Sequence, residues 1–297
     1  MSIRPFGFLT FILSALLAIS SISCRNEQVF QVKGVVKEVL PEGKRVKIEH
    51  EKIPNYMEAM TMTFDVKDAQ EIAGIQPGDM VSFRMIVTDK DGWIDHIKKT
   101  GTTNFATASM PQSLRLVRDV DPLKEGDLVP DYRFTNELGR PLNLSDFRGQ
   151  ALALSFIFTR CPFPTFCPRM SDNFAEAQKK LKTGADMPSN WHLLTISFDP
   201  EFDQPAVLQA YAKRFQADQK HWSFATGEMI DINAITEQFG LLFWKPDPQQ
   251  PTGISHNLRT VVIDTQGRVQ KIFPENTWKV DDLVKEITKA ATVKSKT

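Results

Sequence analysis

Residues 158–168 read FTRCPFPTFCP and place Cys161 and Cys167 in a stretch that contains three prolines. An apolar run over 151–158 precedes this stretch and has the length and the aromatic ending of a buried strand. The charged, amphipathic segment 170–181 follows and is typical of a helix, and Pro168 suits a first helical turn. The sequence therefore predicts two thiols in a loop between a strand and a helix.

The predicted position of Cys167, at or just before a helix N-terminus, favours a thiolate, because unpaired N–H groups and the helix dipole stabilise negative charge there. A thiol pair in such a loop indicates a metal site or a redox site. The alternative is that both cysteines are small buried hydrophobic residues. Structural cysteines seldom flank a proline-rich loop of this kind, so we favour a metal site or a redox site.

The whole chain has 297 residues, with 36 basic and 36 acidic side chains. This length predicts about two domains beyond any targeting segment. The basic residues are scattered and form no stripe, so no nucleic-acid partner is expected.

Residues 1–24 read as a secretory signal: Arg4 is followed by an apolar run over 6–19, small residues and Cys24. The four residues that end at Cys24 resemble a bacterial lipoprotein processing box, which predicts a lipid anchor on Cys24 and a location on the periplasmic side of a bacterial membrane. Ser21 stands where that box usually has Leu, so cleavage without lipidation and an uncleaved anchor stay open. With Cys24 used in processing, Cys161 and Cys167 are the only cysteines left in the body of the mature protein, which excludes a disulfide-rich scaffold.

Residues 29–101 predict a small antiparallel β-barrel, because short strand-like runs alternate with turns. The expected strands are 32–39, 45–50, 60–66, 80–88 and 93–98. Residues 102–122 are polar and aperiodic and are expected to be a linker between domains.

Residues 123–292 predict an α/β domain with a mixed sheet, because strands alternate with helices and a hairpin comes late. The expected strands are 132–135, 151–158, 191–198, 260–264 and 269–273, and the expected helices are 170–181, 205–215, 231–239 and 280–291.

The five residues between Cys161 and Cys167 exceed the two of thioredoxin-type enzymes, and a longer loop lets both sulfurs face one metal. Thiolates select soft ions such as copper(I) and zinc. A third ligand is needed, and His256 is the best candidate because it lies in a polar loop directly before a core strand. His192 and His221 are in settings where histidines are more often structural.

These motifs resemble the Sco/SenC family over about residues 128–289. The resemblance rests on FTRCP at 158–162, FCP at 166–168, SFDP at 197–200, YAKRF at 211–215, and His256 before VVID at 261–264. It implies a thioredoxin-like fold, a copper site made by Cys161, Cys167 and His256, and a role in delivering copper to a respiratory oxidase subunit or in reducing its cysteines. Copper(I) is expected, with copper(II) as an alternative at this site.

The chain departs from the Sco/SenC pattern in its cysteine spacing, since that family usually has three residues between its cysteines. Asp199 and Asp203 resemble positions near the family's site. A strand end for Asp199 and a helix cap for Asp203 are the equally open alternatives.

A methionine-rich stretch in the first half offers a second soft ligand set. Met60 and Met62 share a face if they lie on a strand, and His50 ends the preceding strand. Thioethers and an imidazole suit copper(I), although methionine is also a common core residue. The stretch resembles the CusF-type periplasmic copper-binding domain, which implies an OB-like barrel and a copper site of His50, Met60 and Met62. Met57 stands where that family has a tryptophan that caps the copper. Either Met57 is a further thioether ligand, or the cap is lost in this chain.

The expected function is therefore an exported copper chaperone with two copper sites, rather than a turnover enzyme. The main alternative makes Cys161 and Cys167 a catalytic redox pair of a thiol-disulfide oxidoreductase, which needs neither His256 nor the methionines. A peroxide-reducing role and a bare interaction module are weaker alternatives.

Overall fold

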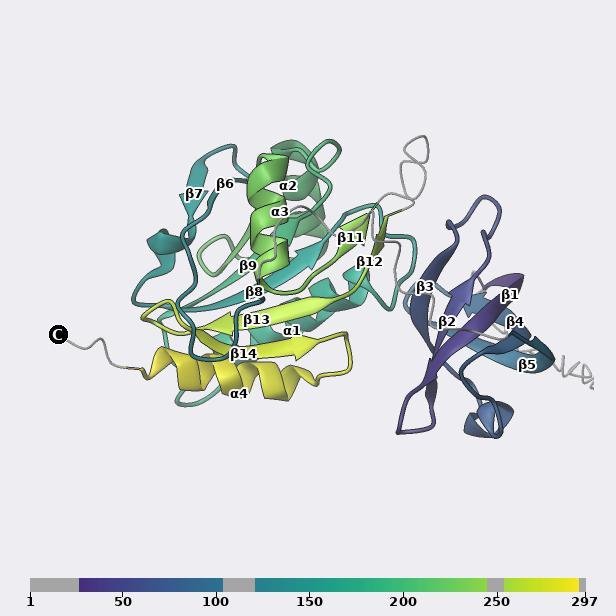
Figure 1. Cartoon of the computed structure of the whole chain (residues 1–297). Coiled ribbons are helices and arrows are strands. Elements are labelled where there is room, and N and C mark those ends of the chain that lie inside the picture. Colours follow the sequence, from purple (N-terminus) through teal and green to yellow (C-terminus); the bar gives the residue numbers. More distant parts are fainter. Residues whose placement is uncertain (1–26, 104–120, 245–253, 294–297) are drawn as a thin grey trace, which may run out of the picture.

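The structure is a computed structural model that describes residues 27–103, 121–244 and 254–293 (Figure 1). The expected signal over 1–24, with Cys24, lies outside the described residues, as does most of the expected linker. Among the residues described, no helix is long and apolar enough to cross a bilayer.

The first part of the described chain forms an antiparallel sheet in the order β3-β2-β1-β4-β5. Its strands are β1 (Gln28–Val39), β2 (Arg45–His50), β3 (Met60–Asp65), β4 (Asp79–Val87) and β5 (Gly92–Thr102), with a short 3-10 helix, η1 (Ala69–Ile72). A parallel bridge between Val66 and Ile94 joins the end of β3 to β5 and closes the sheet. The closed sheet is the OB-like barrel that the sequence predicts.

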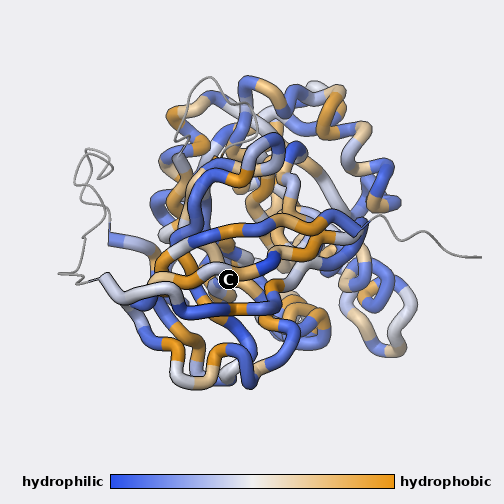
Figure 2. Tube along the Cα trace, turned by 90° about the vertical axis from the view of Figure 1, so that its right-hand side faces the viewer, coloured by the Kyte–Doolittle hydropathy of each residue, from blue (hydrophilic) through white to orange (hydrophobic). Residues whose placement is uncertain are grey.

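Alternation along the strands explains why the barrel has one core. In β2, Val46, Ile48 and His50 are buried, while the residues between them are more exposed. Figure 2 shows that hydrophobic and hydrophilic residues are interspersed along the trace. Side chains of a strand point to opposite faces in turn, so this period of two places one face in the barrel interior.

The second part forms a mixed sheet in the order β14-β13-β8-β9-β10-β6-β7 among the described residues. Its strands are β6 (Arg133–Asn136), β7 (Pro141–Asn143), β8 (Ala151–Ile157), β9 (Trp191–Ser197), β10 (Trp222–Thr226), β13 (Arg259–Ile263) and β14 (Val269–Pro274). A separate hairpin pairs β11 (Phe243–Trp244) with β12 (Ser255–His256), and η3 (Leu144–Phe147) is a 3-10 turn. The sequence reasoning missed β7, β10, β11 and β12.

Helices cover both faces of the mixed sheet. They are α1 (Cys167–Thr183), α2 (Pro205–Arg214), α3 (Met229–Gln238) and α4 (Val280–Ala291). The helices α1 and α4 pack together on one face, and α2 and α3 lie on the other (Figure 1). Every residue of β8 and β9 is buried, as expected for parallel strands covered on both sides.

The strand directions make this part thioredoxin-like. Strand β8 is parallel to β9 and antiparallel to β13, which in turn pairs with β14. The cysteine loop leaves the carboxyl end of β8 and leads into α1, so it lies at the end of the sheet that is nearest the barrel (Figure 1). The fold thus places both cysteines at the carboxyl end of a central strand.

Candidate metal centre

Cys161 and Cys167 lie at the two ends of the loop between β8 and α1. Cys167 is the first residue of α1 and is fully buried, with Pro168 in the first turn, whereas Cys161 is half-buried. Both are free thiols. The sequence therefore predicted the position of Cys167 at the helix start correctly.

His256 reaches the two cysteines from the β11–β12 hairpin. Its Nε2 atom lies 3.7 Å from the Cys167 sulfur, and the ligand atoms of Cys161, Cys167 and His256 all lie within 4.8 Å of one another. The Nδ1 atom of His256 lies 2.8 Å from the carbonyl oxygen of Asn257. If Nδ1 carries the ring proton, that contact is a hydrogen bond and leaves Nε2 with a free lone pair toward the sulfurs.

Aromatic rings enclose this centre. Phe158, Phe166 and Phe198 are buried and pack around the His256 ring, with centroids 5.6, 6.1 and 4.9 Å away. Such a wall keeps water away from the His256 ring and the buried Cys167 sulfur, and strengthens electrostatic interactions between the ligand groups.

The two thiols have opposite pKa shifts. Burial acts to raise the pKa of Cys161, but hydrogen bonding from Cys167 and His256 and the charge of His256 outweigh it, so this pKa is held well below its usual value. Burial, together with the neighbouring Cys161, raises the pKa of Cys167 well above its usual value. Of the two sulfurs, Cys161 is therefore the one that favours the thiolate form and Cys167 the one that favours the thiol form.

Two buried acidic residues support the loop instead of lining the site. The Asp203 carboxylate accepts hydrogen bonds from the Thr159 N–H at 3.0 Å and from the Ser197 hydroxyl at 2.5 Å. Arg160 pairs with Asp199 at 2.5 Å. The helix-cap alternative for Asp203 is wrong, because Gln204 is the N-cap of α2 and Asp203 bonds across to the loop before Cys161.

The barrel gathers the second set of candidate ligands. His50 pairs with Met60 across β2 and β3, and paired residues of an antiparallel sheet share a face, so Met62, two residues on, lies on that face too. Met57 is buried in the connection between these strands. The four side chains offer an imidazole and three thioethers, which could hold copper(I).

His50 is arranged like His256. Its Nδ1 atom lies 2.7 Å from the carbonyl oxygen of Glu51, and its buried Nε2 atom has no hydrogen-bond partner among the described residues. Burial is also the main reason why the pKa of His50 is lowered. The ring is thus held neutral, which is the form that a metal ligand requires.

One contact was missed by the sequence reasoning: the cysteine loop packs against the barrel. Phe163, between the two cysteines, is 1% exposed and meets Phe64 of the barrel core edge to face at 6.2 Å. An aromatic residue inside a lengthened, proline-rich loop was the available signal, but a loop contact with a distant domain has no local sequence pattern.

Comparisons with known proteins agree with the geometry. The SCO1/SenC family model matches residues 120–292, and the model of the copper binding periplasmic protein CusF matches residues 29–99. The barrel therefore belongs to a copper-binding type, and the soft donors of both sites fit that metal, so copper is the metal of this protein.

The chain is also similar to individual proteins and solved structures. The chain is 30% identical over 172 residues to a SCO1 protein homolog of Bacillus subtilis (strain 168), covering 56% of this chain and 84% of that protein. A SCO1/SenC family lipoprotein from Bacillus anthracis str. Ames is similar over 56% of this chain and 96% of that one, at 28% identity and a TM-score of 0.48. Yeast Sco1 with copper bound is similar over 57% and 91%, at 19% identity and a TM-score of 0.48. On the family match and the sequence relatives, the chain belongs to the SCO1/SenC family.

Proposed function

We propose that this protein is an exported copper chaperone that delivers copper to the copper centre of a respiratory cytochrome oxidase. The observation that carries the proposal is the meeting of Cys161, Cys167 and His256, from a loop, a helix start and a separate hairpin, within 4.8 Å. Two sulfurs and an imidazole nitrogen this close together are a ligand set that could hold one soft ion. Membership of the SCO1/SenC family supports the oxidase as the client.

Copper(I) is the ion that this donor set suits best, with copper(II) as an alternative. Two thiolates and a neutral imidazole form a soft, three-coordinate environment. Cys161 is ready to bind as a thiolate, whereas Cys167 must lose a proton when the ion enters, because its pKa is raised. Copper binding at this site should therefore release a proton.

The barrel supplies the entry site in this proposal. His50, Met60 and Met62, with Met57 as a further thioether, carry no ligand charge and should hold copper(I) more weakly than two thiolates do. Copper then moves from the barrel, taken as 29–101, to the domain at 123–292, and the 102–122 linker keeps the two at a high effective concentration. A disulfide between Cys161 and Cys167 would remove the acceptor and stop the transfer.

The direct test loads the reduced mature protein with copper(I) without oxygen and desalts it. Copper retained by both sites, and passed on to a reduced oxidase subunit fragment that carries the receiving cysteines, supports the proposal. A protein that keeps no copper overturns it. X-ray absorption then assigns the copper, because thiolate-rich and thioether-rich environments differ.

A thiol-disulfide oxidoreductase is the second candidate, and the low pKa of the half-exposed Cys161 beside a second thiol favours it. His256→Ala separates the two functions. Under the chaperone proposal this variant loses copper from the C-terminal site. Under the alternative it still reduces a disulfide-bonded partner.

Export and lipid anchoring at Cys24 complete the proposal. The signal at 1–24 predicts export, and Cys24 would carry the lipid. Cys24→Ala should move the protein from the membrane fraction to the soluble exported fraction. A protein that stays in the membrane after this change would indicate an uncleaved anchor instead.

A further inference from the structure

The loop between the cysteines is a docking element for the barrel. The Phe163 ring lies over Gly92, where an added Cβ would stand 2.8 Å from the ring. The φ of Gly92 is outside the left-handed region, so the glycine is needed for space. Phe163 also contacts Phe64 of the barrel and Phe166 of its own loop. The family usually has three residues between its cysteines, so the longer loop of this chain has room to insert the Phe163 ring against the barrel. We call this ring the plug.

Polar contacts surround the plug. The Tyr56 hydroxyl donates a hydrogen bond to the Pro162 carbonyl at 3.0 Å. Arg169, in the first turn of α1, pairs with Asp91 at 2.8 Å and lies 3.8 Å from Asp65, both in the barrel part. An apolar centre with polar contacts at its rim is typical of a specific interface.

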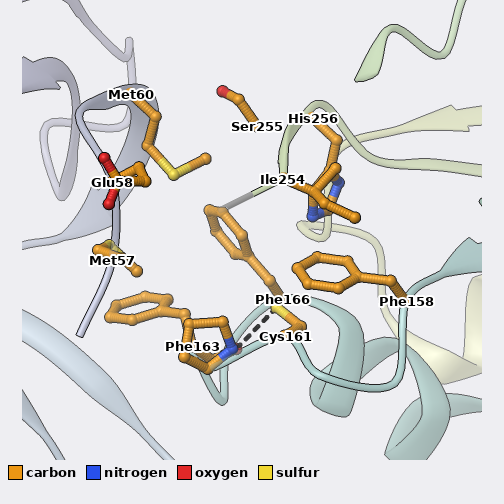
Figure 3. A pocket seen from close by; sticks show the side chains of 11 residues that line it. Met57, Glu58, Met60, Phe158, Cys161, Phe163, Phe166, Ile254, Ser255 and His256 are labelled. Atoms are coloured by element: carbon orange, nitrogen blue, oxygen red, sulfur yellow. Dashed lines mark hydrogen bonds between the residues drawn. The ribbon is translucent and has the colours of Figure 1, made fainter. Parts of the chain in front are cut away.

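The docked arrangement encloses a cavity between the two copper sites (Figure 3). Its volume is about 20 Å³, which is enough for one water-sized ion. Met57 and Met60 line it from the barrel, and Cys161 and His256 line it from the other side. The remaining candidate ligands, His50, Met62 and Cys167, are not part of its wall.

We propose that this cavity is a third copper(I) position, held jointly by Met60 and Cys161 with Met57 and His256 beside them, through which copper crosses between the domains. This inference rests on the proposed function of the two outer sites. Copper stays copper(I) throughout. The Cys161 sulfur first forms a bond to copper(I) as His50 or Met62 leaves the ion. Cys167 then loses its proton to solvent, binds the ion and displaces the Met60 thioether.

Phe166 would control this step. Its ring is drawn between the Met60 side chain and His256 in Figure 3, and it is 8% exposed. Phe166 and His256 both line the cavity, so a rotation of this ring would widen the space between the Met60 side chain and His256. Phe166 is therefore a positioning residue for the transfer rather than a ligand.

The test uses the full mature chain with one deep ligand removed from each outer site, by His50→Gln and Cys167→Ser. This background keeps every ligand that lines the cavity. Copper(I) affinity is measured by competition with a chromophoric chelator, and X-ray absorption identifies the ligand types. We expect one copper with thiolate, thioether and imidazole ligands together, and at least about a tenfold loss of affinity on either Met60→Leu or Cys161→Ser.

Docking is tested separately with Gly92→Val, whose added side chain meets the Phe163 ring. The matched control is Gly101→Val in the same strand, where an added Cβ meets only the Met80 sulfur, at 3.6 Å. In the same background Gly92→Val should lower copper affinity at least about tenfold, and Gly101→Val less than about twofold. Phe163→Ala, which removes the plug and adds no bulk to the barrel, should act like Gly92→Val.

Two outcomes would overturn the shared site. One is a copper(I) affinity that falls in Met60→Leu but not in Cys161→Ser, or the reverse, because that copper would then be bound by one domain alone. The other is unchanged affinity in both Gly92→Val and Phe163→Ala. If the chain with all its natural ligands still binds copper at both outer sites, the proposed function stands and only the shared position fails.

Discussion

The Nδ1 atom of His256 lies 2.8 Å from the carbonyl oxygen of the next residue, Asn257, so that Nε2 faces the two sulfurs. His50 makes the same contact with Glu51, at 2.7 Å. Two unrelated folds thus fix a histidine ring with the backbone of the following residue. When Nδ1 carries the ring proton, this contact orients the ring without a carboxylate partner and leaves the Nε2 lone pair for a soft ion.

His50→Gln should weaken the barrel copper site by about 10-fold or more, because it removes the only imidazole of the ligand set we propose. The measurement is chelator competition in a Cys161→Ser/Cys167→Ser background, where the barrel holds the copper. The control is His96→Asn, since the His96 side chain is 61% exposed. Equal affinities of the two variants would exclude His50 as a ligand.

The two thiols should differ in reactivity. In the reduced, copper-free protein, iodoacetamide should modify Cys161 at pH values below the usual thiol range, because its lowered pKa keeps the thiolate as the pH falls. Cys167 should stay unmodified until the protein unfolds, since it is buried and its pKa is raised. Peptide mass spectrometry against pH measures both rates.

Cys167→Ala tests the cause of this difference. The variant removes a hydrogen bond that lowers the pKa of Cys161, so the midpoint of the alkylation profile should move to higher pH. A profile that does not move would show that Cys167 has no part in the reactivity of Cys161.

Asp203→Ala should lower the free energy of unfolding by about 3 kcal/mol, because the Thr159 N–H and the Ser197 hydroxyl lose a buried acceptor. Asp203→Asn keeps one acceptor oxygen and should cost less than half as much. Urea unfolding of the reduced, copper-free protein measures both. Equal costs for the two variants would contradict the assigned role of the carboxylate.

His192 should make stability fall in acid. Burial, with a contribution from His221, lowers the pKa of His192 from 6.5 to about 4. The unfolded chain therefore binds more protons between pH 6.5 and pH 4, and this histidine alone should remove about 3 kcal/mol of unfolding free energy over that range as the pH falls. Above pH 6.5 it should have no effect on the pH dependence.

The check compares wild type with His192→Gln, which keeps a partner for the Ser223 hydroxyl, 2.9 Å away in the native protein. The difference in unfolding free energy between the two proteins should change by about 3 kcal/mol between pH 7 and pH 4. Parallel pH profiles would mean that His192 is not the group responsible.

The sequence alone determined most of the architecture. Alternation with a period of two indicated the barrel strands, and an apolar run, a proline-rich loop and an amphipathic helix indicated the unit that contains Cys161 and Cys167. These are local patterns, so residues close in the chain carry them. The short strands β11 and β12 were missed because two residues are too few to form a pattern.

Only the tertiary structure decided what lies between the two candidate sites. Nothing in the sequence near Gly92 shows that Phe163 needs its space, since the two residues are far apart in the chain and meet only when the barrel and the cysteine loop pack together. The same holds for Asp203, whose partner Thr159 lies 44 residues away. Local sequence fixes which residues can be ligands, whereas packing between distant segments fixes which of them can share one ion.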